Sequence, residues 1–283
     1  HNILQTAFPM LVAQVLNLLY SIVDRVYIGR IPGAGTEALG AVGLCFPVII
    51  LVTGFTNMFG LGGAPLFSMA LGQGNREKAI DIQNTALRLL VLVGAAILLV
   101  GELLGDRILL LFGATTGELS LALPYLRIYL IGTIFIMVST GMNAYINAQG
   151  FPVIGMISVT IGAASNLILD PLFIFGWKLG VSGAAVATVL SQLLSFLFVL
   201  SFLFGKKNEL PVCFAWSFPY AGAIMSLGLA PFIMQVTNSL VQIACNSVLM
   251  RYGGAVFVSI MTIVSSVRSI LDVPVMAITD GAS

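Results

Sequence analysis

The chain has 283 residues, of which 59% are hydrophobic and only 8% are charged, and its mean hydropathy is +1.07. Soluble domains carry about 25% charged residues, so this composition excludes a water-soluble globule of this size. Twelve basic residues against eleven acidic ones give a formal net charge of +1, which leaves no basic face for nucleic acid. No charge at all occurs in 89–101, 128–169 or 210–250. We therefore predict an all-α polytopic membrane protein.

Eight apolar segments are long enough to cross a bilayer, which takes about 20 helical residues. Charges, Gly/Pro clusters and polar runs separate them, and the expected spans are 3–28, 39–71, 82–104, 119–147, 153–175, 181–204, 222–250 and 255–278. Their unbroken apolar runs favour helices, since barrel strands would alternate over about ten residues. Basic residues are divided almost equally between the two ends of the spans, so charge does not give the orientation in the membrane.

Motifs for several other chemistries are missing from the sequence. Cys45, Cys213 and Cys245 are far apart and form no CxxC pair, so neither a zinc site nor a disulfide framework is indicated. No GxxxxGK[ST] phosphate loop occurs. The chain is therefore not expected to be an enzyme or to carry its own ATP-driven motor.

The seventh span resembles the first. Allowing one residue of slippage after Pro9 and Pro231, the polar residues of the two spans align in four pairs, which are Gln14 with Gln235, Asn17 with Asn238, Ser21 with Gln242, and Asp24 with Cys245. Secondary transporters are commonly built from such repeats, with binding sites between the halves. A repeat of six spans would leave the second unit incomplete, so we expect the natural protein to continue for about four more helices.

Asp170 lies within the apolar sequence SNLILDPLFIF. A charge at the bilayer centre costs about 2.5–3.5 kcal/mol on insertion scales, so this carboxyl must be protonated, ion-bound or facing water. Asn166 lies one turn earlier on the same face, and Pro171 frees the carbonyl of Leu167 from the helix ladder. These oxygens could hold Na⁺ or a proton. The alternative is a structural aspartate that hydrogen-bonds a neighbouring helix.

Asp24 is the second carboxyl of interest. It ends a polar stripe on the first span that includes Asn17 and Tyr20, which indicates a hydrated interior face. It also precedes Arg25 near the end of the span, so an interfacial charge that snorkels to the surface is an open alternative. Similar polar stripes occur on the fourth and sixth spans, and they favour a water-filled cavity among the helices. For any single hydroxyl, contact between helices is the simpler explanation.

Four stretches carry a resemblance to a known family. They are YSIVDRVYIGR, SMALGQGNREKA, NAYINAQG and NLILDPLFIFGWKLGVSGAAVATVLSQ. With them, the chain resembles the N-terminal two thirds of a multidrug and toxic compound extrusion (MATE) transporter of the bacterial DinF-like type. The resemblance implies a MATE-like fold of two six-helix bundles, of which about eight helices would be present here. It divides the chain into an N-terminal bundle at 1–205, an inter-bundle linker at 206–221 and the first two helices of the second bundle at 222–283.

The resemblance also implies a set of site residues. The cation-coupling residues would be Asp24, Asn166, Asp170 and Thr188 through side-chain oxygens, which would hold Na⁺ if that is the ion, and Ala184 through its carbonyl. The substrate cavity would include Asn17, Tyr20, Tyr125, Asn143 and Gln192. Pro9 would be the hinge of the first helix. No cofactor is expected besides the coupling ion, H⁺ or Na⁺. Because the second repeat has Cys245 where the first has Asp24, coupling should be confined to the N-terminal half.

The function implied is cation-coupled antiport that exports cationic or amphipathic compounds across the bacterial plasma (inner) membrane, by a monomer in the lipid bilayer. The main alternative is a flippase for lipid-linked oligosaccharides of the same superfamily. That function would require a cationic cavity for pyrophosphate, and we expect no Arg or Lys at the middle of the first six spans. A structural or receptor-like bundle would show no coupled flux, and an ion channel would need a filter motif that the sequence lacks.

Overall fold

The computed structural model of the chain describes residues 2–31, 35–112, 114, 116–205, 210–212 and 217–241, and the single residues 244, 245, 248, 252 and 264. Regular structure within these ranges is helical throughout. The elements are α1 (Asn2–Gly29), α2 (Gly35–Gly72), α3 (Arg76–Leu111), α4 (Thr116–Ile131), α5 (Thr133–Ala148), α6 (Pro152–Pro171), the π-helical turn η1 (Leu172–Gly176) and α7 (Val181–Leu203). A further helix covers Ala221–Val241. The predicted all-α class is confirmed.

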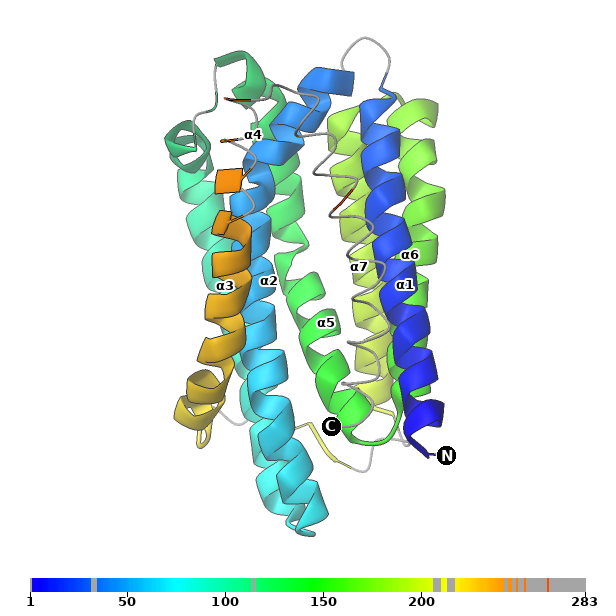
Figure 1. Cartoon of the computed structure of the whole chain (residues 1–283), viewed down its shortest axis with the longest axis vertical. Helices are drawn as coiled ribbons and strands as arrows, with labels where there is room; N and C mark the ends of the chain where they lie inside the picture. Colours follow the sequence, from blue (N-terminus) through cyan, green and yellow to red (C-terminus); the bar gives the residue numbers. More distant parts are fainter. Residues whose placement is uncertain are drawn as a thin grey trace.

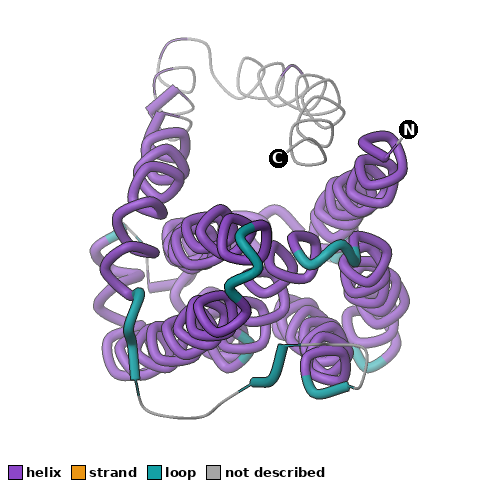
Figure 2. Tube along the Cα trace, turned by 90° about the horizontal axis from the view of Figure 1, so that it is seen from below, coloured by secondary structure: helices purple, strands orange, loops and turns teal. Residues whose placement is uncertain are grey.

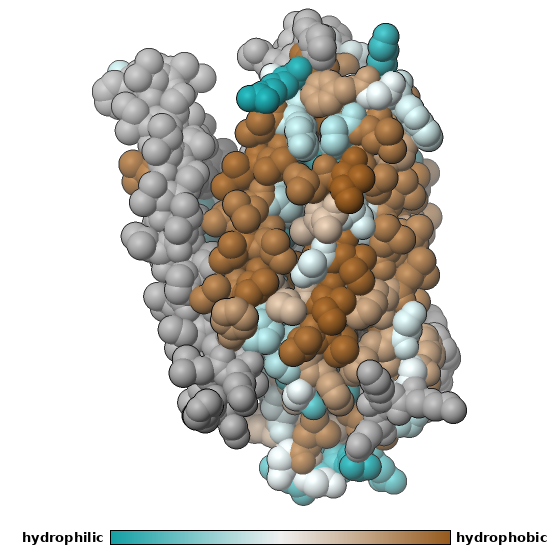
Figure 3. Space-filling view, turned by 90° about the vertical axis from the view of Figure 1, so that its right-hand side faces the viewer, coloured by the Kyte–Doolittle hydropathy of each residue, from teal (hydrophilic) through white to brown (hydrophobic). Residues whose placement is uncertain are grey.

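Seven of the eight predicted spans coincide with helices of the structure. In the described part of the chain, six helices are long and apolar enough to cross a membrane, and the bent pair α4 and α5 would make a seventh span. The seventh predicted span is described continuously as far as Val241, and the eighth, at 255–278, lies outside the described residues apart from residue 264. The surface agrees with a lipid environment, because apolar side chains cover the middle of the face in Figure 3 and hydrophilic ones lie at its two ends.

The fourth predicted span, 119–147, is bent in the structure. The chain bends by 51° between Ile131 and Thr133, which divides the span into α4 and α5. Gly132 lies at the bend, and a Cβ there would be 2.8 Å from Cγ2 of Val189 on α7. The glycine therefore lets α7 approach the bend, and the apolar sequence on both sides gave no sign of a break.

The third helix is longer than predicted at both ends. It begins at Arg76 rather than residue 82 and ends at Leu111 rather than residue 104. Asn75 caps its start, since the backbone N–H of Lys78 donates to Asn75 Oδ1 at 3.1 Å. The polar first turn thus belongs to the helix, although its charges place it outside the apolar core of a membrane.

The helices form two groups that meet through α5 and through direct contact of α4 with α7. Figure 1 shows α1, α6 and α7 on one side, α2, α3 and α4 on the other, and α5 between them. Helix α1 packs mainly against α6, and α5 contacts α2, α3, α6 and α7. The end-on view of Figure 2 shows the helices as neighbouring tubes connected by short loops. This arrangement brings α1, α6 and α7, which carry the predicted coupling residues, into direct contact.

The segment after α7 is held on the bundle. Asn84 Nδ2 on α3 donates to the carbonyl of Pro211 at 3.2 Å, and Arg88 donates to the carbonyl of Ser217. The helix Ala221–Val241 then packs closely on α2, because a Cβ on Gly62 would lie 2.5 Å from Cα of Gly228. The division of the chain at 206–221 into two bundles stays a prediction.

Candidate functional site

Asn166 and Asp170 lie one turn apart on α6 and are almost completely buried, with 2% and 0% of their surfaces exposed. Asn166 Nδ2 donates to Asp170 Oδ1 at 3.2 Å and to Thr188 Oγ1 on α7 at 3.4 Å. The amide therefore joins the two helices and orients the carboxyl. The spacing of four residues put the two side chains on one face, as the sequence predicted.

The second oxygen of the Asp170 carboxyl has no such donor. Oδ2 is buried, and no amide or hydroxyl group among the described residues donates to it. The carboxyl of Asp24 on α1 lies close enough to Asp170 to interact with it. Two carboxylates this close together inside a membrane protein repel unless a proton or a cation lies between them. The residues present thus fit a site for H⁺ or for an oxygen-bound cation such as Na⁺.

A cavity of about 300 Å³, called here the acidic cavity, lies beside this carboxyl pair. Six of the predicted site residues line it, namely Asn17, Tyr20, Asp24, Tyr125, Thr188 and Gln192. Asp24 and Thr188 belong both to its wall and to the group around Asp170. Ion binding and occupation of the cavity would therefore affect each other through two shared side chains.

Helix α2 forms a wall of the acidic cavity that the sequence did not predict. Its lining residues include Phe46, Thr53 and Thr56. The two threonine hydroxyls donate to carbonyls of their own helix, at 2.9 Å to Ile49 and 2.7 Å to Val52. Because α2 is apolar on every face, its polar residues form no stripe, and only the small group of threonines could have indicated the wall.

A second cavity of about 170 Å³, called here the amide cavity, lies between α1, α5 and α6. Asn143, predicted with the other substrate residues, lines this cavity together with Asn147. Its Nδ2 donates to the carbonyl of Gly155 at 3.3 Å. Oδ1 of Asn143 and Oδ1 of Asn147 are buried and accept no hydrogen bond within the described part of the chain. Asn17 and Thr140 line both cavities, so the two adjoin.

The two remaining predicted residues lie on neither cavity wall. Ala184 is 1% exposed in the first turn of α7, one turn before Thr188. Pro9 is buried within α1, which continues as a helix on both sides of it. The roles of Ala184 as a carbonyl ligand and of Pro9 as a hinge stay predictions.

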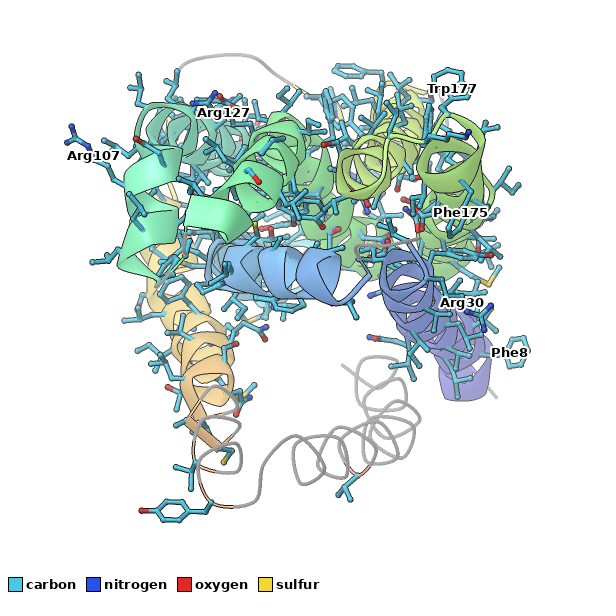
Figure 4. All side chains as sticks on the ribbon, turned by 90° about the horizontal axis from the view of Figure 1, so that it is seen from above. Phe8, Arg30, Arg107, Arg127, Phe175 and Trp177 are labelled. Carbon is cyan, nitrogen blue, oxygen red and sulfur yellow. The ribbon has the colours of Figure 1, made fainter. Side chains whose placement is uncertain are left out.

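Two basic residues lie within the helices of the third and fourth predicted spans, toward one end of each span rather than at its middle. Arg88 lies inside α3, where it donates to Ser217, and Arg127 lies inside α4, where it pairs with Glu102 at 3.8 Å. Helix–loop and helix–helix contacts accommodate these charges. Neither is among the described residues that line the two cavities, and Figure 4 shows Arg127 on the opposite side of the view from Phe175 and Trp177.

Comparison with known proteins agrees with this architecture. The family model described as MatE matches residues 9–172. The multidrug export protein MepA of Staphylococcus aureus (strain MRSA252) is 26% identical over 250 residues, which are 87% of this chain and 55% of MepA. The chain thus spans about half the length of the curated relatives it matches.

Solved structures resemble the chain over nearly its whole length. A structure described as the outward-facing conformation of a multidrug resistance MATE family transporter of the MOP superfamily is 25% identical, with a TM-score of 0.91 over 99% of this chain and 62% of the other. A structure of MATE in the bent conformation is 26% identical, with a TM-score of 0.87 over 99% of this chain and 63% of the other. The predicted MATE-like fold is confirmed.

Proposed function

The chain belongs to the MatE family, and we propose that it forms the ion-coupling half of an antiporter that exports cationic or amphipathic compounds in exchange for H⁺ or Na⁺. It is a multi-pass protein of the bacterial inner membrane, in keeping with its apolar helices and its bacterial relatives. The name of its relative, a multidrug export protein, supports small amphipathic molecules as the exported substrates. The transporter would work as a monomer.

The pair of Asp24 and Asp170 carboxyl groups carries the proposal. Asp170 is fully buried, no described amide or hydroxyl donates to its Oδ2, and the Asp24 carboxyl hydrogen-bonds its side chain. An aspartate that served only to join helices would bind a hydrogen-bond donor rather than a second carboxyl. Two carboxyl groups in contact among membrane helices, one of them lining a cavity, are suited to bind and release a cation.

Coupling requires that the ion and the substrate bind two conformations of the transporter with different affinities. When the pair is empty, repulsion between the carboxylates separates α1 from α6 and leaves the acidic cavity open to a cationic substrate. When H⁺ or Na⁺ binds, it neutralises the pair and draws Asp24 toward Asp170. We propose that α1 accommodates this movement by bending at Pro9, which lacks a backbone N–H for the helix ladder. The acidic cavity then narrows and the substrate leaves.

The alternative of an oligosaccharide-lipid flippase has less support. A pyrophosphate group binds Arg or Lys. The described residues that line either cavity carry carboxyl, amide and hydroxyl groups, and none of them has a basic side chain. The acidic cavity would repel an anionic head group because it contains Asp24.

The test is substrate efflux from proteoliposomes that contain the full-length protein, under a pH gradient or a Na⁺ gradient. The wild type and Asp170→Asn are compared with Asp106→Asn, an exposed carboxyl on α3. The proposal expects one gradient to drive export by the wild type and by Asp106→Asn, and it expects Asp170→Asn to bind substrate but to export it far more slowly. Undiminished export by Asp170→Asn would contradict the proposed coupling site. If neither gradient drives efflux of a cationic dye, the flippase becomes the preferred function.

A further inference from the structure

A π-helical turn follows directly after the coupling aspartate. Asp170 and Pro171 end α6, and η1 then covers Leu172–Gly176. The backbone N–H of Trp177 donates to the carbonyl of Leu172 at 2.9 Å, five residues back. π-turns are uncommon and frequently lie at functional sites. This one lies between Asp170 and the start of α7, so its shape affects where both α6 and α7 place their side chains.

Helix α7 rests on the backbone of this turn. A Cβ on Gly183 would lie 2.8 Å from both C and O of Phe173 and 3.1 Å from N of Ile174. Backbone atoms cannot turn aside as the end of a side chain can, so only glycine lets α7 lie at this distance. Ala184 follows immediately, and Thr188 lies on the same helix within reach of the Asn166 amide.

Helix α1 contacts the same turn from another side. The rings of Tyr27 and Phe175 meet edge to face, with centroids 6.2 Å apart. Tyr27 lies three residues after Asp24 on α1. Figure 4 shows Phe175 above Arg30 in the view, on the side of the molecule where α1 ends. The turn thus touches the helix that carries Asp24 and the helix that carries Thr188, while its own chain continues from Asp170.

We infer that Gly183 and the π-turn η1 fix the separation of Asp24, Asp170 and Thr188, and so set the affinity of the coupling-ion site. Gly183 is a positioning residue that touches no ion or substrate and acts through the backbone of Phe173. The inference rests on the proposed function, because it assigns η1 a role in binding the ion that drives export.

The longest hydrogen bond around Asp170 shows which contact would break if α7 moved away from η1. The bond from Asn166 to Thr188 is 3.4 Å long, close to the limit for a hydrogen bond. A methyl group on Gly183 would separate α7 from η1, so this bond would break first. Thr188 would then leave the site, and Asn166 Nδ2 would keep only its hydrogen bond to Asp170 Oδ1.

The experiment measures thermal unfolding of the purified full-length protein as Na⁺ is added at fixed pH, and as pH is lowered without Na⁺. Half-maximal thermal stabilisation of Gly183→Ala should require an ion concentration about 10–100-fold higher than for the wild type, as expected when a contact that orients an ion ligand is lost. The matched control is Gly162→Ala on α6, where a Cβ would make ordinary contact at 3.6 Å with Ser195 of α7. This control should keep the wild-type ion dependence.

A second variant avoids adding atoms to a crowded contact. Phe175→Leu removes the ring contact with Tyr27 and should also raise the ion concentration needed, by less than Gly183→Ala does. If Gly183→Ala does not fold, the ion dependence of Phe175→Leu tests the inference by itself. Ion dependence like that of the wild type in the folded variants would overturn the inference and leave the proposed function intact. A wild type that neither Na⁺ nor H⁺ stabilises would overturn both.

Discussion

Two adjoining cavities lie within one bundle and share Asn17 and Thr140, yet they differ in chemistry. The acidic cavity contains Asp24 and lies beside the buried Asp170. The amide cavity is lined by carboxamides, a hydroxyl and apolar groups, with no carboxyl among its described residues. Carboxyl groups can exchange protons and bind Na⁺, whereas amides are neutral at every physiological pH. Sensitivity to the coupling ion should therefore reside in the acidic cavity, which also admits the cationic substrate, whereas the amide cavity should contribute only hydrogen bonds to that substrate.

The largest effect should come from removing either carboxyl. Asp24→Asn and Asp170→Asn should each lower gradient-driven export by about 5–150-fold, the range of typical coupling free energies. The double variant should be no worse than either single one, because the two groups act as a unit on one ion. Transport assays of all three variants test this, and additive losses would show that the carboxyls act separately.

An intermediate effect is expected at the amide that orients the pair. Asn166→Ala leaves Asp170 Oδ1 and Thr188 Oγ1 without their donor. Loss of a buried hydrogen-bond partner costs about 1–3 kcal/mol, so the ion concentration for half-maximal export should rise about tenfold. Thr188→Val removes only the longer contact and should have a smaller effect. A larger effect of Thr188→Val would mean that its hydroxyl binds the ion more strongly than Asn166 orients it.

A smaller and different effect is expected in the amide cavity. Asn147→Ala and Asn143→Ala each remove an acceptor, worth about 0.5–1.5 kcal/mol, and should raise the substrate concentration for half-maximal export about two- to tenfold. The ion dependence should stay at its wild-type value. Transport rates measured as a function of substrate concentration and as a function of ion concentration separate these two dependences. A change in the ion dependence alone would contradict the division of roles between the cavities.

The smallest effect is expected on the stability of the fold rather than on transport. Ser158 and Ser195 join α6 and α7 through hydroxyls 2.9 Å apart. Ser158→Ala keeps the bond from Ser195 to the carbonyl of residue 158, which is 3.0 Å long. Thermal unfolding should show a loss of stability of about 0.5–1.5 kcal/mol, with normal ion and substrate dependence. Altered coupling in this variant would extend the ion site farther along α6 than proposed.

The local parts of the site could be predicted from the sequence, because they depend on helical spacing. Asn166 and Asp170 are four residues apart on one helix, so their contact follows from the geometry of the helix alone. Thr188 lies on another helix, and only the family resemblance indicated that it belongs to the same site. The apolar runs likewise predicted the spans, since the length of a helix in a membrane follows from its composition.

The parts that depend on packing could not be predicted. Tyr125 and Asn143 were expected to face one cavity, but Tyr125 lines the acidic cavity and Asn143, farther along α5, lines the amide cavity. Gly132 marks the bend between α4 and α5, yet many glycines within membrane helices cause none. The π-turn η1 follows Pro171 without a sequence signal of its own, because its extra residue is stabilised by contacts from Gly183 and Tyr27.

Infrared difference spectroscopy of the purified full-length protein tests the central claim most directly. A pH step, made with and without Na⁺, reveals the carbonyl band of any buried carboxylic acid that gains or loses its proton. The account predicts a band change in the wild type that is lost in both Asp24→Asn and Asp170→Asn. The same band change in the wild type and in both variants would show that this pair does not bind the coupling ion.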